Sequence, residues 1–422
     1  MRDLDVGDGF RGRRRVKRTE IESEILEWIE EPEWHADEAR FERLVLALFR
    51  FQFDHCEPYA RYAMALDRTP DRVEHAAQIP AVPTGAFKEF DLRCFEAEAT
   101  TRVFRTSGSS TARRGALALD TLALYEASLL ASLRRCFLTD LVGRAPMMRF
   151  LAPSAEEAAD SSLSHMFETL RRTEGADGSA FDLREGRLDL EALRRAIRGA
   201  RAECPERPVV LAGTSFAFVH LLDATAGEDA DTAPDTEHDW RLPPGSRILE
   251  TGGFKGRSRE VPRDVLRAEL ARRFGLPPSS IVNQYGMTEL GSQFYDSTLL
   301  DPGGPRRKRV PPWTRVRLID PATGEDVRAG EVGMVLVQDL ANTGSVAAVQ
   351  TADLGRLVLD EQGEAIGFDV LGRAAGAEER GCSLAADLML DPDPHPGPHP
   401  KVAAGRARGA APETGREQEG RR

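Results

Sequence analysis

The chain has 422 residues, and its 57 Lys and Arg against 69 Asp and Glu leave a formal net charge of −12. With 41% hydrophobic and 30% charged residues it has the composition of a folded globular protein, which excludes collagen-like and fully disordered classes, and the negative charge disfavours nucleic acid as a partner. Five cysteines without a CxxC pair fit a reducing, cytoplasmic compartment, and no apolar run approaches the ~18 residues needed to span a membrane.

The N-terminal region begins with a basic segment and continues into helices. Residues 1–18 combine Gly with Arg and Lys and lack apolar periodicity, so we expect a disordered leader, either a solvated tail or a binding arm. Thr19 and Glu22 have the spacing of a capping box, which predicts a helix that begins at Thr19. A second amphipathic helix is predicted around residues 41–49.

The middle of the chain has α/β character. From about residue 100 to 300, short β-branched runs alternate with longer helical patterns, such as a helical pattern over 190–197 before the strand-like run 209–211. Residues 223–245 are rich in Asp, Thr and Pro, which predicts an excursion on the surface.

The C-terminal third changes to short alternating runs separated by Gly and Asp turns. Those between Thr314 and Phe368 predict an antiparallel, β-barrel-like subdomain at about 310–372. The main folded unit is expected to span 19–390. Bulky apolar residues are almost absent afterwards, so residues 391–422 are expected to form a disordered tail.

The strongest local signal for chemistry is the segment Phe104-Arg105-Thr106-Ser107-Gly108-Ser109-Ser110-Thr111-Ala112-Arg113-Arg114-Gly115. Small hydroxyl residues around Gly108 let a backbone approach a ligand closely and offer N–H and O–H donors, as a polyanionic phosphate requires. The segment lacks the GxxxxGK[ST] pattern of the nucleoside triphosphatase P-loop. Taken alone, it fits a phosphate loop and a flexible surface turn equally well.

A second signal, Asn283-Gln284-Tyr285-Gly286-Met287-Thr288-Glu289, follows a strand-like pair of residues. Tyr285 can stack on a base, Thr288 can bind a phosphate oxygen and Glu289 can help to hold Mg²⁺, and an ATP site requires all three. The alternative is an ordinary polar turn at the end of a strand.

Together these segments resemble the adenylate-forming superfamily of acyl- and aryl-CoA ligases, adenylation domains and firefly-type luciferases. Five segments follow in the superfamily's order: Thr106-Ser107-Gly108-Ser109-Ser110, Glu250-Thr251-Gly252-Gly253, Tyr285-Gly286-Met287-Thr288-Glu289, Thr351-Ala352-Asp353-Leu354-Gly355 and Gly372-Arg373. The resemblance implies the large α/β N-terminal domain of that fold, with the first segment on the phosphates of ATP and the glycine pair beside the adenine. It also implies Asp353 on the ribose, Glu289 on Mg²⁺ and Arg373 at an interdomain hinge. Ala352 stands where the superfamily has a glycine.

Further segments narrow the resemblance to the acyl-protein synthetase (LuxE) family, over roughly residues 20–390. They are Ile79-Pro80, Ala86-Phe87-Lys88, Ser161-Ser162-Leu163-Ser164-His165-Met166, Gly252-Gly253-Phe254-Lys255-Gly256 and Arg380-Gly381-Cys382-Ser383-Leu384. The family implies that ATP and a carboxylic acid, a long-chain fatty acid, give acyl-AMP and pyrophosphate. The acyl group then passes to a protein cysteine and on to a reductase or carrier. Cys382 is the implied acyl acceptor, and a small structural residue in a final helix is the alternative.

The resemblance also implies that the small mobile C-terminal domain of the CoA ligases is absent, together with the lysine that it contributes. Lys88 and Lys255 are embedded in motif-like segments and are candidate catalytic lysines, with surface cations as the alternative. Three other functions stay open. They are an acyl- or aryl-CoA ligase of the phenylacetate-activating kind, acyl transfer to a separate carrier protein, and a non-catalytic scaffold.

Overall fold

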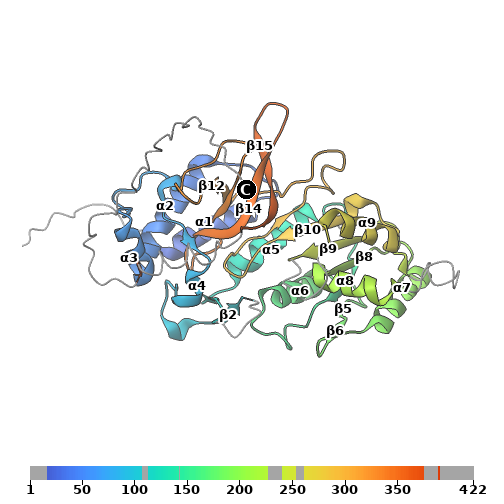
Figure 1. Ribbon diagram of the computed structural model, residues 1–422. Coiled ribbons are helices and arrows are strands. Elements are labelled where there is room, and N and C mark those ends of the chain that lie inside the picture. Colours follow the sequence, from blue (N-terminus) through green and yellow to red (C-terminus); the bar gives the residue numbers. More distant parts are fainter. Residues whose placement is uncertain are drawn as a thin grey trace, which may run out of the picture.

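The computed structural model describes residues 17–106, 113–141, 143–226, 240–252, 261–374 and 388–389. These residues form two large sheets in adjacent halves of the molecule, with helices packed around them, and two two-stranded hairpins (Figure 1). The predicted leader up to residue 16 and the predicted tail lie outside the described residues. So do seven predicted site residues: Ser107, Gly108, Ser109, Ser110, Gly253, Lys255 and Cys382.

The described chain opens with α1 (Arg18–Ile29), α2 (Glu38–His55) and α3 (Glu57–Ala65). α1 begins one residue before the predicted start, and its N-cap is Lys17, so the capping-box prediction is wrong. A bidentate ion pair explains the earlier start. Arg18 donates to Asp120 Oδ2 at 2.6 Å and to Oδ1 at 2.8 Å, and therefore belongs to the fold and not to the leader.

The larger sheet has six strands in the order β11-β10-β9-β8-β4-β5. They are β4 (Met147–Leu151), β5 (Ala180–Phe181), β8 (Val209–Thr214), β9 (Arg247–Thr251), β10 (Ile281–Tyr285) and β11 (Phe294–Tyr295). All neighbours are parallel except β10 and β11. Because Gln284 lies opposite Thr251, and Thr251 opposite Thr214, the carboxyl ends of β8, β9 and β10 meet at one edge. Ligands of open α/β sheets bind at such an edge.

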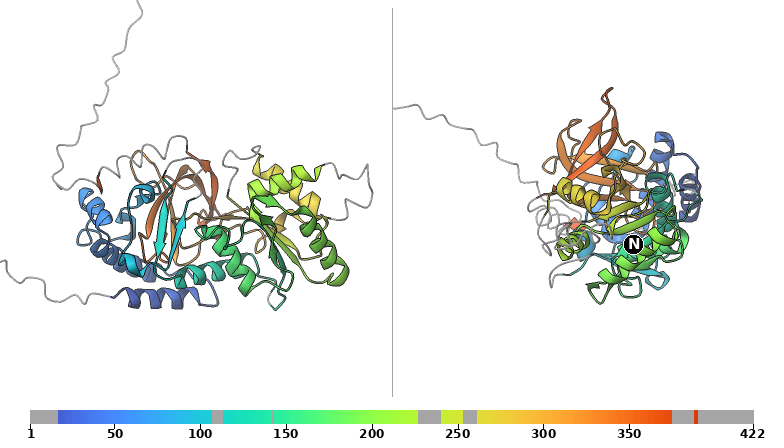
Figure 2. Two further views of the ribbon diagram at one scale, coloured as in Figure 1. Left: turned by 90° about the horizontal axis from the view of Figure 1, so that it is seen from below. Right: turned by 90° about the vertical axis from the view of Figure 1, so that its right-hand side faces the viewer.

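Helices cover both faces of this sheet (Figure 2). α5 (Ala123–Cys136) and α6 (Ser162–Thr173) share one core, and α7 (Leu190–Glu203), α8 (Ser215–Ala224) and α9 (Arg263–Phe274) share the other. In β8, Val210 and Ala212 enter the first core while Val209 and Leu211 enter the second, as expected for a strand buried on both faces. Trp240 is fully buried in the second core, so the predicted surface excursion ends before residue 245.

The smaller sheet confirms the antiparallel strands predicted for the C-terminal third. β12 (Thr314–Ile319), β13 (Val332–Asp339), β14 (Ala348–Leu359) and β15 (Ala365–Arg373) pair antiparallel in that order. β1 (Val82–Pro83) pairs in parallel with the start of β14. The sequence did not indicate β1, because two residues carry no periodic pattern.

Short elements complete the described chain. They are α4 (Ala86–Glu89), the hairpin of β2 (Arg102–Arg105) and β3 (Ala116–Leu119), the hairpin of β6 (Leu183–Arg184) and β7 (Arg187–Leu188), and the 3₁₀ turns η1 (Ala76–Gln78), η2 (Ala97–Ala99) and η5 (Pro278–Ser280).

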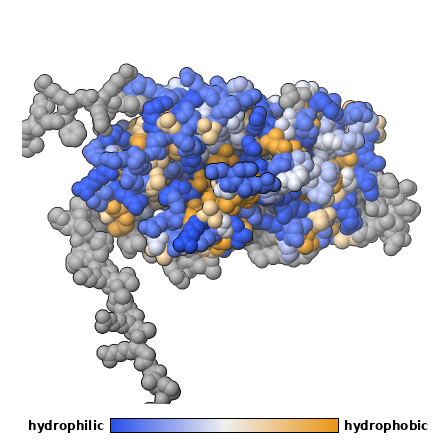
Figure 3. Space-filling view, turned by 90° about the horizontal axis from the view of Figure 1, so that it is seen from above, coloured by the Kyte–Doolittle hydropathy of each residue, from blue (hydrophilic) through white to orange (hydrophobic). Residues whose placement is uncertain are grey.

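The surface is mainly hydrophilic on the face shown in Figure 3, with hydrophobic residues gathered near the middle of the molecule. Large exposed hydrophobic side chains of the described residues come from different elements: Met64, Leu66, Val265, Leu300, Val332 and Leu371. Among the described helices, none combines the length and the apolar character needed to cross a lipid bilayer.

Candidate active site

Tyr285 is the last residue of β10 and lies at the carboxyl edge of the larger sheet. Its hydroxyl donates to Asp353 Oδ2 at 2.9 Å, which joins two motif segments from different sheets. Its ring packs against Phe294 and, edge-on, against Phe368. Burial, with Asp353 beside the hydroxyl, raises the pKa of Tyr285 well above its usual value, so the phenol stays protonated and donates.

Asp353 on β14 lies directly opposite Arg373 on β15. Arg373 Nε is 3.7 Å from Asp353 Oδ1, and the N–H of Asp353 donates to Thr351 Oγ1 at 3.1 Å. The side chain of Asp353 is 17% exposed and that of Arg373 is 70% exposed. The carboxylate is therefore held by a tyrosine on one side and reached by solvent on the other. This arrangement suits an acceptor for the hydroxyls of a ligand.

The turn after β10 carries the residues predicted for phosphate and metal. A Cβ on Gly286 would lie 2.5 Å from Gln284 Nε2, and Gln284 is buried and bonded to Thr251, so a side chain there would displace it. Thr288 is partly exposed, whereas Glu289 is only 7% exposed. After burial and Asp353, the charge of Glu289 also contributes to the raised pKa of Tyr285.

Gly252 follows β9 at the same edge of the sheet. Its φ of +69° lies in the left-handed region, which favours glycine. Ser215 Oγ donates to Gly252 O at 3.1 Å, and Thr251 Oγ1 donates to Gln284 O at 3.1 Å. These bonds tie the ends of β8, β9 and β10 together beside Tyr285.

The described ends of the predicted phosphate loop meet at the hairpin of β2 and β3. The Thr106 N–H donates to Gly115 O at 2.9 Å, and the Gly115 N–H donates to Thr106 Oγ1 at 3.0 Å. Arg114 Nε donates to Thr106 O at 2.6 Å, and its NH1 pairs with Asp160 at 2.8 Å. The Thr106 hydroxyl thus accepts one bond within the hairpin, and a hydroxyl group can also donate one.

Lys88 on α4 lies next to this hairpin. The position of a Cβ on Gly115 is 3.6 Å from the carbonyl carbon of Phe87. The N–H of Thr84, between β1 and α4, donates to Gln350 O on β14 at 3.0 Å. β1 and α4 therefore connect the strand of Asp353 with Gly115, at the described end of the predicted phosphate loop. Lys88 is partly buried, and its catalytic role stays a prediction.

A buried network beneath the site was missed. Lys308, 3% exposed, donates to Asp296 Oδ1 at 2.9 Å and to Asn283 O at 2.7 Å. The backbone N–H of Asn283 donates to Asp296 Oδ2 at 2.9 Å, and its side chain donates to the Glu250 carboxylate. No sequence pattern indicated this network, because Lys308 stands in the run Arg306-Arg307-Lys308-Arg309, which is typical of solvated charge.

A metal ion at this site would be coordinated by oxygens of a bound molecule as well as by protein side chains. Among the described residues, no group of three or more His, Cys, Asp or Glu side chains could hold an ion by itself. Glu289 offers carboxylate oxygens and the neighbouring Thr288 a hydroxyl. These hard oxygen donors suit Mg²⁺, which keeps waters and phosphate oxygens among its ligands. The residues therefore fit Mg²⁺ that arrives on a nucleotide.

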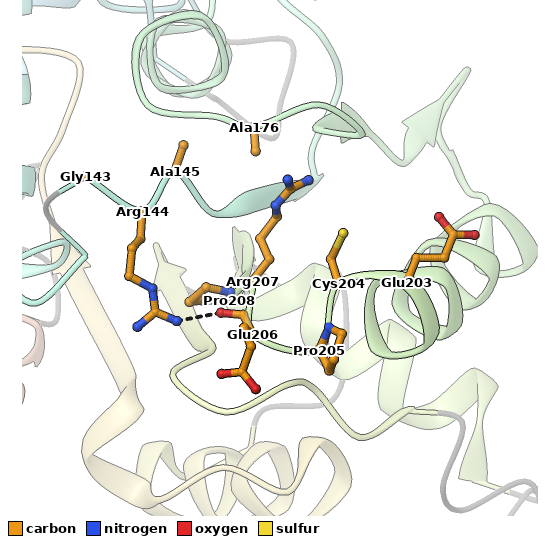
Figure 4. Close-up of a pocket in the computed structure, with 10 residues that line it drawn as sticks. All are labelled: Gly143, Arg144, Ala145, Ala176, Glu203, Cys204, Pro205, Glu206, Arg207 and Pro208. Atoms are coloured by element: carbon orange, nitrogen blue, oxygen red, sulfur yellow. Dashed lines mark hydrogen bonds between the residues drawn. The ribbon is translucent and has the colours of Figure 1, made fainter.

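A depression of about 530 Å³ lies at a different place in the fold (Figure 4). Its lining includes Arg144, Cys204 and Arg207, from the turn before β4 and from the connection between α7 and β8. The depression lies at the amino ends of β4 and β8, the edge opposite to Tyr285. None of the predicted site residues lines it, so it is not the candidate active site.

Comparison with known proteins places the chain in a family. A family model described as acyl-protein synthetase, LuxE, matches residues 16–390. The long-chain-fatty-acid–luciferin-component ligase of Vibrio harveyi is 23% identical over 350 residues, which cover 81% of this chain and 86% of the relative. The ligase of the same name from Aliivibrio fischeri is 23% identical over 367 residues, covering 84% of this chain and 90% of the relative.

Solved structures agree on the fold. 2-Hydroxyisobutyryl-CoA ligase in the postadenylation state matches with a TM-score of 0.58 at 15% identity, over 81% of this chain and 69% of that chain. Its open conformation matches with a TM-score of 0.56 at 16% identity, over 79% and 75%. The described residues thus have the fold of an adenylate-forming ligase, and no separate domain follows β15 within them. With a family model that matches most of its length, the chain belongs to the acyl-protein synthetase (LuxE) family.

Proposed function

We propose that this protein uses ATP to convert a carboxylic acid into acyl-AMP and pyrophosphate, and then transfers the acyl group to a cysteine for delivery to a reductase. The hydrogen bond between Tyr285 and Asp353 carries the proposal, because it joins segments 68 residues apart that resemble the nucleotide-binding motifs of the superfamily. Membership of the acyl-protein synthetase family supports the transfer step. The names of the two bacterial relatives support a long-chain fatty acid as the substrate.

In the first step, a carboxylate oxygen of the acid attacks the α-phosphorus of ATP, and the bond to the bridging oxygen breaks as pyrophosphate leaves. Asp353, held by Tyr285, would accept from the ribose hydroxyls, and Gly252 would lie beside the adenine. Thr106 and Thr288 would donate to phosphate oxygens. Mg²⁺ on Glu289 would offset phosphate charge. No general base is needed, because the acid is already ionised near neutral pH.

In the second step, the thiolate of Cys382 attacks the carbonyl carbon of acyl-AMP. The bond from that carbon to the phosphate oxygen breaks, AMP leaves, and a thioester forms after the thiol proton has passed to solvent. Lys88 or Lys255 is the candidate to contact the acyl carboxylate and the α-phosphate. A reductase or carrier partner and a cytoplasmic location remain predictions.

The test is an incubation of the purified protein with Mg²⁺, ATP and acids of increasing chain length, without CoA. We expect acid-dependent ATP–pyrophosphate exchange and a mass increment on the protein that hydroxylamine removes. Cys382→Ser should keep the exchange and lose the increment. Cys204→Ser is the matched control, because Cys204 is the partly exposed cysteine among the described residues, and it should keep both.

Other outcomes would replace this proposal. Labelling that persists in Cys382→Ser, or that appears only on an added carrier protein, would favour transfer to a carrier. Release of acyl-CoA when CoA is added would favour a CoA ligase. Nucleotide binding without exchange for any acid would favour a scaffold.

A further inference from the structure

The loop that carries Thr288 and Glu289 is fastened to the smaller sheet at its far end. Asp339, the last residue of β13, is fully buried. Its Oδ2 accepts from the N–H of Ser292 at 2.8 Å and its Oδ1 accepts from Ser292 Oγ at 2.7 Å. Asn342, in the turn after β13, donates from Nδ2 to the backbone oxygen of Glu289 at 3.1 Å.

Asn342 is itself fixed from two directions. Its Nδ2 also donates to Val346 O at 2.9 Å, within the same turn. Its backbone oxygen accepts from Gln52 Nε2 of α2 at 3.0 Å, and Gln52 Oε1 accepts from the N–H of Ala347 at 3.0 Å. The amide that holds Glu289 therefore cannot move unless the turn between β13 and β14 moves with it.

Packing between the turn and the loop leaves no room for adjustment. A Cβ on Gly291 would lie 3.0 Å from the carbonyl carbon of Ala341, so the two backbones are in close contact. Ser292 Oγ lies 2.9 Å from Ser128 Oγ, and Trp313 Nε1 donates to Ser128 Oγ at 2.9 Å. A chain of hydrogen bonds from α5 and from Trp313, the residue before β12, thus ends on the carboxylate of Asp339.

We propose that Asn342 and Asp339 are positioning residues that set the place of Glu289 for the Mg²⁺-bound nucleotide. The inference rests on the proposed function. A side chain is aimed by its backbone, and Asn342 holds the backbone oxygen of Glu289 while Asp339 holds the residue three positions later. Asp353 holds Tyr285 at the start of the same loop. The smaller sheet therefore fixes the loop at both ends and in the middle.

The test compares Asn342→Leu with Gln338→Leu. Gln338 is the neighbour of Asp339 on β13, is 2% exposed, and donates to Ala76 O at 2.7 Å, away from the loop. Calorimetry measures ATP binding with Mg²⁺ and with EDTA, and exchange assays give kcat and KM. In the wild type, Mg²⁺ should raise the affinity for ATP by a certain factor. We expect this factor to be about tenfold smaller in Asn342→Leu, and kcat to fall about tenfold. The KM for the acid should stay within twofold of the wild-type value. Gln338→Leu should keep both values per folded molecule.

Equal behaviour of the two variants, after correction for the folded fraction, would overturn the proposal. Ser292→Ala is the second variant if Asn342→Leu fails to fold. This change removes one hydroxyl that touches Asp339, and it should reduce the gain in ATP affinity that Mg²⁺ confers. If that gain is unchanged in Ser292→Ala, the proposal is also overturned. Wild-type protein that shows neither Mg²⁺-dependent ATP binding nor exchange would instead reject the proposed function.

Discussion

Two buried carboxylates anchor the two ends of the loop after β10, and they are stabilised in opposite ways. Asp296 accepts from the N–H of Asn283 ahead of the loop and is paired with Lys308. Asp339 accepts from Ser292 behind the loop, and its donors within the described part of the chain are neutral. Burial alone would raise both pKa values. Nearby cations outweigh burial and hold the pKa of Asp296 below its usual value, while the pKa of Asp339 is raised to about 6.

The difference follows from what lies next to each anchor. The donors to Asp339 come from Ser292 and Ala341, next to the turn whose Asn342 holds the backbone of Glu289. Neutral donors hold the loop there without adding positive charge. At the other end, Lys308 is buried and bonded to Asp296 and Asn283. We infer that the loop combines an ionic anchor at Asp296 with an anchor at Asp339 that is built from neutral donors.

The largest effect is expected from breaking the ionic anchor. Lys308→Met should lower the free energy of unfolding by about 3–5 kcal/mol, because it leaves Asp296 buried with Arg306 as its remaining ion-pair partner among the described residues. Urea unfolding measures the loss. Adding Asp296→Asn should restore part of the stability, since the buried carboxylate that has lost its lysine is then replaced by a neutral amide. A loss below about 1 kcal/mol would show that the pair behaves like an exposed one.

The anchor at Asp339, which is held by neutral donors, should change the pH dependence of the unfolding free energy. The pKa of Asp339 is raised from 3.8 to about 6, so its contribution to stability is fully present below pH 3.8 and is lost as the pH rises through 6. Relative to Asp339→Asn, the wild type should lose about 3 kcal/mol of unfolding free energy between pH 4 and pH 7. Asp296, with its lowered pKa, should have the opposite slope, because its contribution is lost as the pH falls. If the difference in unfolding free energy between the wild type and Asp339→Asn does not change with pH, Asp339 is not a buried carboxylate held by neutral donors.

The sequence indicated the candidate site residues better than the residues that hold them in place. Tyr285, Glu289 and Asp353 stand in short local motifs, and the alternation of β13 and β14 was readable because it repeats every two residues. The pairing of Asp339 with Ser292 spans 47 positions and joins two sheets, and no local pattern encodes it. Lys308 was missed for the same reason, since only the fold shows that one residue of a basic run is buried.

Glu289→Gln separates the carboxylate proposed to hold Mg²⁺ from the two anchors. We expect a loss of about 100-fold in acid-dependent ATP–pyrophosphate exchange, which corresponds to about 2.7 kcal/mol of transition-state stabilisation, because one charged ligand of Mg²⁺ is removed. The melting temperature should change far less than in Lys308→Met, because the amide keeps the shape of the carboxylate and Asn342 still binds the backbone oxygen of residue 289. Exchange within threefold of the wild type would reject Glu289 as the metal ligand.

The smallest effect is expected at Asp353, the third carboxylate that holds the loop. Unlike the two anchors it is partly exposed, and its proposed partner, the ribose, is bound in the ground state and in the transition state alike. Loss of such uniform binding raises KM without a matching fall in kcat. Asp353→Ala should therefore raise the KM for ATP about tenfold, or about 1.4 kcal/mol, and lower kcat by less than threefold.

Tyr285→Phe removes the hydrogen bond but keeps the carboxylate, so its effect on KM should be smaller. If kcat collapses in Asp353→Ala while KM holds, Asp353 acts by fixing the loop through Tyr285, and the smaller sheet then holds the catalytic residues at three points without contacting the ribose.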